Sequence, residues 1–117
     1  DKIGKNGVMQ FTSYGLDLHN HAHKGAVDVF KKMSTKHCID KVFVHSSSKK
    51  EWSKFGKHVG LVDKIHHIYP KTGNVVSASI PVAMDNAIES GKLKRDEHIV
   101  FWVGSAGMSF SATRLKY

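Results

Sequence analysis

Two polar side chains stand where an α/β protein usually places its chemistry. His45 follows the apolar run Lys41–Val44, which reads as a buried strand of a mostly parallel sheet, and functional groups gather at the carboxyl ends of such strands. Asn74 lies in a Gly-Asn turn directly before an apolar helix. An imidazole N–H and an amide NH₂ are neutral donors that stabilise negative charge on an oxygen atom. From the residues alone, a turn residue or helix N-cap is the simpler interpretation of Asn74.

Cysteine and histidine offer two further kinds of chemistry. Cys38 is the single cysteine, so no intramolecular disulfide forms, and a small buried hydrophobic side chain is a better interpretation than a nucleophile. His19, His21 and His23 alternate, a spacing that could hold zinc or nickel on an extended segment. Because no cysteine or carboxylate cluster accompanies them, we interpret them as solvated loop histidines and expect no metal site.

Hydrophobic periodicity predicts a mixed α/β order for the elements that carry these side chains. The turn Gly104–Gly107 is too short for a crossover connection, so the strands on either side of it must form an antiparallel hairpin. Ser48 and its two neighbouring serines can cap the helix that follows His45. We expect helices over residues 24–33, 49–59 and 75–90, and strands over 41–44, 65–69, 98–103 and 108–115.

The central helix of residues 75–90 organises the rest of the chain. Pro81 is tolerable only in the first turn, so the helix should begin within Val75–Ser77 and leave Asn74 just outside. Small side chains on this helix allow close approach to other backbones. The expected buried face consists of Ile80, Met84, Ala87 and Ile88.

Composition bounds the class of protein. A length of 117 residues corresponds to a single domain, and a hydrophobic content of 40% is enough to form a buried core. The formal charge of +8 favours an acidic partner, but the lysines are scattered and most aromatic residues lie in strand-like runs, which disfavours nucleic acid. No apolar run is long enough for a signal peptide or a membrane span, so we expect a cytoplasmic protein without a membrane partner.

Residues Thr72–Tyr117 resemble the C-terminal end of the type III β-ketoacyl-acyl-carrier-protein synthases of the thiolase-like superfamily. The signature of that family is Gly-Asn-Thr-Ser-Ala-Ala-Ser-(Ile/Val)-Pro, and this chain reads Gly73-Asn74-Val75-Val76-Ser77-Ala78-Ser79-Ile80-Pro81. In the family an upstream strand ends in His-Gln-Ala-Asn, and His45 falls in the place of that histidine. The sequence departs from the pattern where Ser46-Ser47-Ser48 replace Gln-Ala-Asn and Val75 replaces threonine.

The resemblance implies a thiolase-like C-terminal half-domain over residues 1–117, most simply a fragment of a larger enzyme. It implies decarboxylative Claisen condensation of an acyl thioester with malonyl-acyl-carrier protein, as in fatty-acid or polyketide-like biosynthesis. His45 and Asn74 would be the catalytic residues, and the backbone amide of Ala106 would contribute to the oxyanion site. The nucleophilic cysteine would lie in the absent N-terminal half, so the isolated chain should be inactive. The substrates would be coenzyme A and acyl-carrier-protein thioesters, with no cofactor.

The same resemblance suggests partners. Lys49, Lys50 and Lys54 would bind the acidic acyl carrier protein, the N-terminal half-domain would complete the fold, and the full-length enzyme would be a homodimer. The resemblance does not specify the length of the acyl chain in the substrate or the identity of the acceptor. The alternative is a non-catalytic basic module that uses these lysines to bind an acidic carrier protein or nucleic acid.

Overall fold

The computed structural model describes residues 15–33, 38–105 and 108–117. These residues form a mixed α/β layer structure around a four-stranded sheet of order β2-β1-β3-β4. The elements are α1 (Gly15–Lys32), β1 (Lys41–Val44), α2 (Lys49–His58), η2 (Val62–Lys64), β2 (Ile65–His66), α3 (Tyr69–Thr72), η3 (Val76–Ala78), α4 (Ser79–Glu89), β3 (His98–Ser105) and β4 (Ser109–Lys116).

Strand β1 lies in the interior of the sheet and runs parallel to both of its neighbours. Val42 is in register with Ile65 of β2 and with Val100 of β3. Strand β4 pairs antiparallel with β3 along its full length, from His98 opposite Lys116 to Ser105 opposite Ser109. The predicted mixed sheet and closing hairpin are therefore confirmed.

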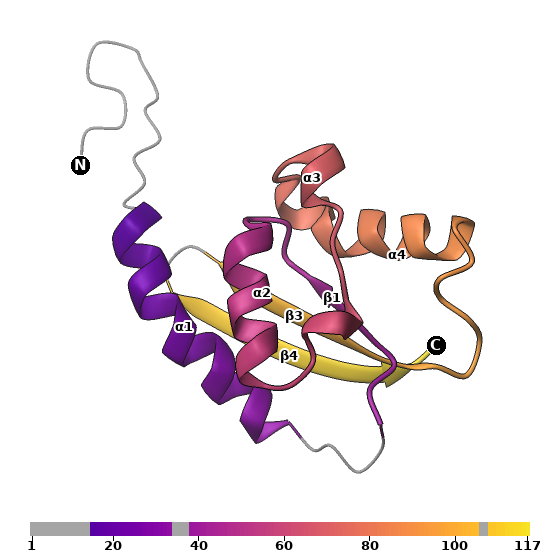
Figure 1. Ribbon diagram of the computed structural model, residues 1–117, viewed down its shortest axis with the longest axis horizontal. Coiled ribbons are helices and arrows are strands. Elements are labelled where there is room, and N and C mark those ends of the chain that lie inside the picture. Colours follow the sequence, from indigo (N-terminus) through magenta and orange to yellow (C-terminus); the bar gives the residue numbers. More distant parts are fainter. Residues whose placement is uncertain (1–14, 34–37, 106–107) are drawn as a thin grey trace.

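One face of the sheet is covered by α1 and α2, which lie side by side (Figure 1). Its centre is Trp102, which is fully buried, with its ring centroid 4.7 Å from that of Phe30 and 5.2 Å from that of Trp52. The Trp102 indole N–H donates to the carbonyl oxygen of Ala26 at 3.0 Å, so its one polar atom is satisfied. We call this the aromatic face. Its buried members are Ala22, Ala26, Phe30, Ile39, Val42, Val44, Trp52, Phe55, Ile65, Val100 and Trp102.

The other face carries α4 and is built from smaller side chains. Ala83 and Ala87 are fully buried against Phe43 and Ile99 of the sheet. Their spacing of four residues puts them on one stripe of the helix, and the lack of larger side chains there lets α4 approach the strands closely. We call this the α4 face. Its buried members are Phe43, Ile68, Ala83, Ala87, Leu93 and Ile99.

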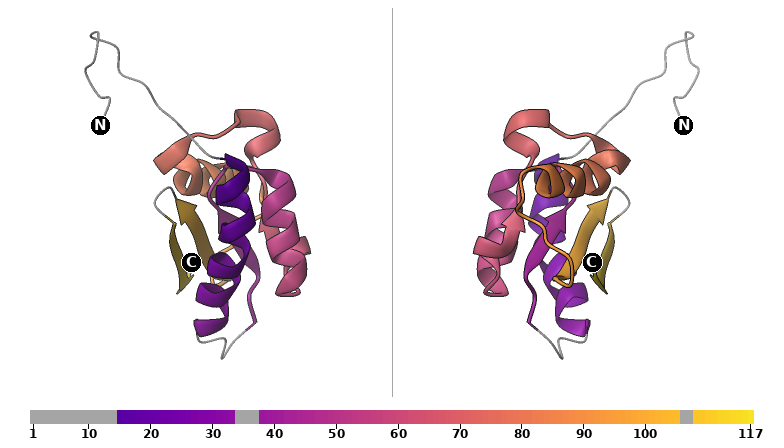
Figure 2. Two further views of the ribbon diagram at one scale, coloured as in Figure 1. Left: turned by 90° about the vertical axis from the view of Figure 1, so that its left-hand side faces the viewer. Right: turned by 90° about the vertical axis from the view of Figure 1, so that its right-hand side faces the viewer.

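The carboxyl end of β1, the start of α2, α3 and the start of α4 gather at one end of the molecule (Figures 1 and 2). The parallel strand β1 delivers its last residues to this end, as strands of α/β sheets do at their functional edge. His45, which follows β1, and Asn74, which lies between α3 and η3, both belong to this end of the molecule.

Two predictions about the first helix were wrong. Helix α1 begins at Gly15, well before the expected start at Lys24, because Ala22, Ala26 and Phe30 continue one buried stripe toward the N-terminus. His21 and His23 are therefore helical, where a loop was expected. Residues two apart on a helix point to different sides, so His21 and His23 do not have the one-sided arrangement that an extended segment would give them. None of the helices in the described parts of the chain is long and apolar enough to cross a membrane.

Three smaller differences concern the elements near the site. Strand β2 covers only Ile65–His66, because residues 69–72 form the short helix α3, with Pro70 in its first turn. The central helix starts with the 3₁₀ turn η3 at Val76, and α4 proper begins at Ser79, so Pro81 lies in its first turn as predicted. Ile88 is 43% exposed and does not belong to the buried face, which follows the stripe of Ala83 and Ala87.

Candidate active site

His45 stands directly after the last residue of β1. Its backbone N–H donates to the carbonyl oxygen of Trp102 at 3.2 Å, which extends the parallel ladder by one residue and fixes the exit direction of the chain. The imidazole is half-buried, and its Nδ1 lies 3.4 Å from the hydroxyl oxygen of Ser79. Burial lowers the pKa of His45 below its usual value, and the backbone carbonyl of Val76 opposes that change. Its surroundings therefore favour the neutral form of the ring.

Asn74 lies in the turn between α3 and η3. The preceding Gly73 has φ 66° and ψ −158°, a backbone region that is essentially limited to glycine. The Asn74 side-chain oxygen accepts the backbone N–H of Val76 at 2.9 Å, which closes an Asx turn. Because the oxygen is engaged, the exposed amide NH₂ is the group left to act as a donor. The structure thus confirms the predicted position of Asn74 just outside the helix.

Two buried serines tie the end of β1 to this turn. The hydroxyl of Ser46 donates to the carbonyl oxygen of Gly73 at 2.7 Å, and that of Ser79 donates to the carbonyl oxygen of Val76 at 2.7 Å. Both serines are at most 3% exposed. His45 and Asn74 are consequently linked through one set of bonds that runs from Asn74 through Val76 and Ser79 to the imidazole.

Sequence reasoning missed the role of these two serines. Ser46 was noted only as a replacement in the family pattern, and Ser79 only as a small residue that allows close packing. The available signal was local, because a serine in the first turn of a helix often bonds a backbone carbonyl of the preceding turn. Its contact with His45 joins residues 34 positions apart and requires the fold.

Val76 adds strain at the same place. Its φ of 51° is unusual for a β-branched residue, and its side chain is 65% exposed. Such a conformation costs on the order of 1–3 kcal/mol and persists only where the surroundings hold it. The bonds from Asn74 to its N–H and from Ser79 to its carbonyl are those surroundings.

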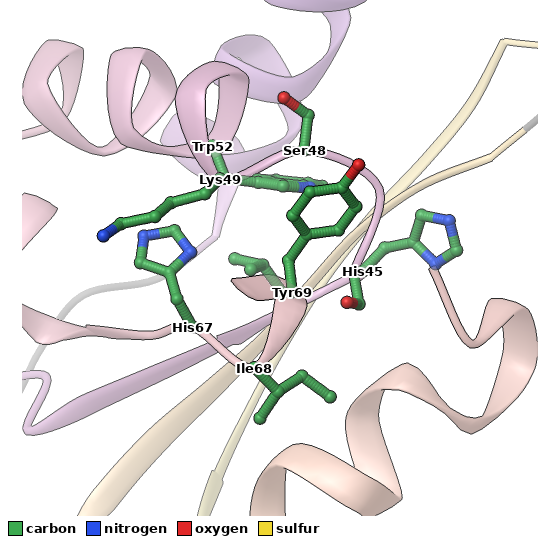
Figure 3. Close-up of a pocket in the computed structure, with 9 residues that line it drawn as sticks. His45, Ser48, Lys49, Trp52, His67, Ile68 and Tyr69 are labelled. Atoms are coloured by element: carbon green, nitrogen blue, oxygen red, sulfur yellow. The ribbon is translucent and has the colours of Figure 1, made fainter. Parts of the chain in front are cut away.

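A shallow pocket lies beside the site, between the start of α2 and residues 67–69 (Figure 3). Lys49, Trp52, His67 and Tyr69 line it, whereas the imidazole of His45 points away from them, toward the start of α4. Burial lowers the pKa of His67, and the nearby charge of Lys49 lowers it further. His67 Nε2 lies 3.3 Å from the hydroxyl of Ser53, within hydrogen-bond range.

The three lysines expected to bind a carrier protein lie on α2, next to the site. Ser48 caps this helix by accepting the N–H of Glu51 at 3.3 Å, as predicted. Lys49 and Lys50 are exposed in its first turn, and Lys54 forms an ion pair with Glu51 at 2.9 Å. An exposed ion pair of this kind contributes little to stability.

The remaining candidates do not join the site. Cys38 precedes β1 while His45 follows it, so the two lie at opposite ends of the strand, and Cys38 is exposed rather than buried as expected. His23 stacks on Phe55, with ring centroids 5.4 Å apart, and meets His58 edge-on at 5.1 Å. Within the described ranges no three potential ligands gather into a metal site. Ala106 lies outside the described residues.

Comparisons with known proteins agree on one family. Residues 29–117 match the family model described as "3-Oxoacyl-[acyl-carrier-protein (ACP)] synthase III C terminal". Relatives include the β-ketoacyl-acyl-carrier-protein synthase III of Neisseria meningitidis serogroup B, 32% identical over 68% of this chain and 25% of the relative. The enzyme of the same name from Xanthomonas euvesicatoria is 25% identical over 97% of this chain and 37% of the relative.

Solved structures share the fold. The 3-oxoacyl-acyl-carrier-protein synthase III of Aquifex aeolicus aligns with a TM-score of 0.84 and 23% identity, over 98% of this chain and 39% of that one. The enzyme of Pseudomonas aeruginosa aligns with a TM-score of 0.83 and 18% identity, over 92% and 35%. The chain thus spans between a quarter and two-fifths of the length of these proteins. On the family match and its fold, the chain belongs to the C-terminal family of the 3-oxoacyl-acyl-carrier-protein synthases III, within the thiolase-like fold.

Proposed function

We propose that this chain is the C-terminal part of a longer 3-oxoacyl-acyl-carrier-protein synthase III, and that the whole protein condenses an acyl thioester with malonyl-acyl-carrier protein. The acyl group would first pass from coenzyme A to a cysteine of the N-terminal half. Decarboxylation of the malonyl group would then yield the carbon nucleophile that attacks the acyl-enzyme. The named relatives and the family membership support this reaction class.

His45 and Asn74 have the chemistry that the decarboxylation step requires. As the carboxylate leaves, negative charge moves to the thioester oxygen, and hydrogen-bond donors aimed at that oxygen stabilise the resulting enolate. A neutral amide achieves this without protonating the neighbouring carbanion. The observation that carries the proposal is the Asx turn of Asn74, because it engages the amide oxygen and leaves the NH₂ as the donor, in a turn that is bonded to His45 through Val76 and Ser79.

The nucleophile belongs to another part of the protein in this proposal. Cys38 is exposed and lies at the end of β1 remote from His45, so it is badly placed to share a substrate with the imidazole. The N-terminal half-domain would supply the cysteine, the complete protein would form a homodimer, and the isolated chain would not turn over.

The assay that tests this function uses the full-length protein with an acyl-coenzyme A and malonyl-acyl-carrier protein. We expect 3-oxoacyl-acyl-carrier protein as the product and a single acyl group on the enzyme by intact-mass measurement. Cys38→Ala should leave both unchanged, and the 117-residue chain alone should give neither. An acyl adduct on Cys38, or no condensation by the full-length protein, would overturn the proposal.

The carrier protein would dock on the start of α2, where Lys49 and Lys50 are exposed next to the site. A phosphopantetheine arm reaches the reacting centre only if its acidic carrier binds nearby, and basic side chains favour that encounter. Lys54 is the weaker member of the set because it already pairs with Glu51.

Charge reversal separates docking from chemistry. In the full-length protein, Lys50→Glu with Lys54→Glu should raise KM for the carrier-borne substrate by about tenfold and leave turnover of the coenzyme A thioester nearly unchanged. Added salt should reduce the difference in KM for the carrier-borne substrate between the unsubstituted protein and the Lys50→Glu, Lys54→Glu variant. The matched control is Lys92→Glu, an exposed lysine that follows α4. An equal loss with both substrates would contradict docking at this surface.

A further inference from the structure

Two groups that can accept a hydrogen bond interact with the His45 ring, the hydroxyl of Ser79 and the carbonyl of Val76. Ser79 is 1% exposed, and its hydroxyl oxygen lies 3.4 Å from His45 Nδ1. The same hydroxyl lies 2.7 Å from the carbonyl oxygen of Val76 and donates to it. A hydroxyl has one proton, so Ser79 presents a lone pair, and no proton, to the imidazole.

The carbonyl of Val76 also favours a protonated nitrogen on the His45 ring. It is an acceptor only, and it interacts with His45 in the direction that favours a protonated ring nitrogen. Val76 cannot easily turn this carbonyl elsewhere, since its N–H is held by Asn74 and its backbone sits in the left-handed region. Because the Ser79 hydroxyl presents an acceptor to Nδ1 and the Val76 carbonyl also favours a protonated ring nitrogen, Nδ1 is the nitrogen of the neutral imidazole that carries the proton.

We propose that Ser79 is a positioning residue that fixes neutral His45 as the Nδ1–H tautomer and leaves Nε2 as an unprotonated acceptor. In a neutral imidazole one nitrogen donates and the other accepts, so the bonds on the Nδ1 side decide what Nε2 can do. Ser79 does so without touching a substrate, from the first turn of α4.

The tautomer gives His45 an order of action within the proposed reaction, and this step rests on the proposed function. The free Nε2 lone pair accepts the proton of the cysteine thiol, so that an S–H bond breaks, an N–H bond forms, and a thiolate and an imidazolium result. The thiolate attacks the acyl thioester, the bond between the acyl carbon and the coenzyme A sulfur breaks, and the departing coenzyme A thiolate takes its proton from solvent. The Nε2–H of the imidazolium therefore stays in place and, as a charged donor, joins the NH₂ of Asn74 at the malonyl thioester oxygen. His45 thus donates only after it has acted as a base.

The tautomer can be measured on the 117-residue chain itself, without any activity. The chain is labelled with ¹⁵N-histidine, and a long-range ¹H–¹⁵N correlation spectrum is recorded well above the pKa of His45, where protonated and unprotonated ring nitrogens are distinct. We expect His45 to appear mainly as the Nδ1–H form. A main Nε2–H form in the unsubstituted chain would overturn the proposal regardless of any variant.

Three variants test the part played by Ser79. Ser79→Ala should raise the ratio of Nε2–H to Nδ1–H about three- to tenfold, the equivalent of one ordinary hydrogen bond. Ser79→Thr keeps the hydroxyl and should keep the original ratio. Ser90→Ala is the matched control, because Ser90 also bonds a helix carbonyl, that of Asn86 at 2.7 Å. An unchanged ratio in a folded Ser79→Ala chain would contradict the proposal, whereas absence of condensing activity in the full-length protein would contradict only the proposed function.

Discussion

The two faces of the sheet are built by different means. The aromatic face buries Trp52, Phe55 and Trp102 under α1 and α2, with ring centroids 5.2–6.2 Å apart. The α4 face buries alanines, and its functional end is held by hydroxyl and amide bonds to backbone carbonyls and N–H groups. Large aromatic side chains contribute strongly to burial on the aromatic face, whereas directional bonds set the positions of His45 and of the Asn74 turn. Stability and site geometry are thus largely separate in this chain.

Trp102→Ala should have the largest effect on stability, because it removes the centre of the aromatic face. A loss of about 3–5 kcal/mol in the free energy of unfolding is expected for such a cavity. Urea unfolding followed by circular dichroism measures it, and Trp102→Phe should lose less because the ring is partly retained. If Trp102→Ala lowered the free energy of unfolding by less than a substitution on the α4 face such as Ala83→Leu, the contrast between the two faces would be wrong.

The α4 face should respond to added volume rather than to removed volume. Ala83 is fully buried against the sheet, so Ala83→Leu should destabilise the chain by about 1–3 kcal/mol through overpacking. The neighbouring Val82 is 37% exposed, and Val82→Leu is the matched control, with little expected change. If Ala83→Leu changed the free energy of unfolding as little as Val82→Leu, the inference that α4 packs closely on the sheet at Ala83 would be wrong.

Gly73→Ala should cost less in stability and more in site geometry. No atom lies within 4 Å of the added Cβ, so the cost is backbone strain alone, about 1–2 kcal/mol. Gly91→Ala, also at φ 66° with open space, should cost about 1 kcal/mol. Only Gly73→Ala should shift the NMR signals of His45, because the Gly73 carbonyl is bonded to Ser46. Equal shifts in both variants would contradict this link.

The smallest effect is a pH dependence from the half-buried histidines. Burial lowers the pKa of His45 and of His67 below the ordinary value of 6.5, so the unfolded chain binds more protons between 6.5 and the lowered values. Stability should therefore fall as pH decreases through that window. Urea unfolding at about pH 7.5 and about pH 5.5 measures the slope, which His67→Gln should reduce. Trp102→Phe should leave the slope unchanged, and an increased slope in His67→Gln would contradict the account.

The sequence predicted the parts of this structure that depend on local patterns. The strand at residues 41–44, the helix capped by Ser48 and the closing hairpin each have a short-range signal in apolar periodicity or turn length. The start of α1 was missed because its buried stripe is made of alanines, which carry a weak hydrophobic signal. Strand β2 was overestimated because Ile68 packs with the α4 face and Tyr69 begins α3, so neither residue pairs with β1.

The site was predictable to the level of residue types but not of bonds. His45 follows a strand and Asn74 precedes a helix, and both positions can be read from the chain. That Ser46 and Ser79 join them depends on which segments meet at the end of the sheet, and no local pattern contains that information. The exposure of Cys38 and of Ile88 is likewise set by packing between distant elements.

The decarboxylation of a malonyl thioester by the full-length protein with Asn74→Asp tests the central claim most directly. The carboxylate can still accept the N–H of Val76, so the turn is kept while the NH₂ donor is lost. Asn86→Asp is the matched control, since that amide oxygen lies 3.0 Å from His66 Nε2 and away from the site. We predict that Asn74→Asp lowers the rate about 100- to 1,000-fold and that Asn86→Asp changes it little. A folded Asn74→Asp protein that decarboxylates at the original rate would contradict the account.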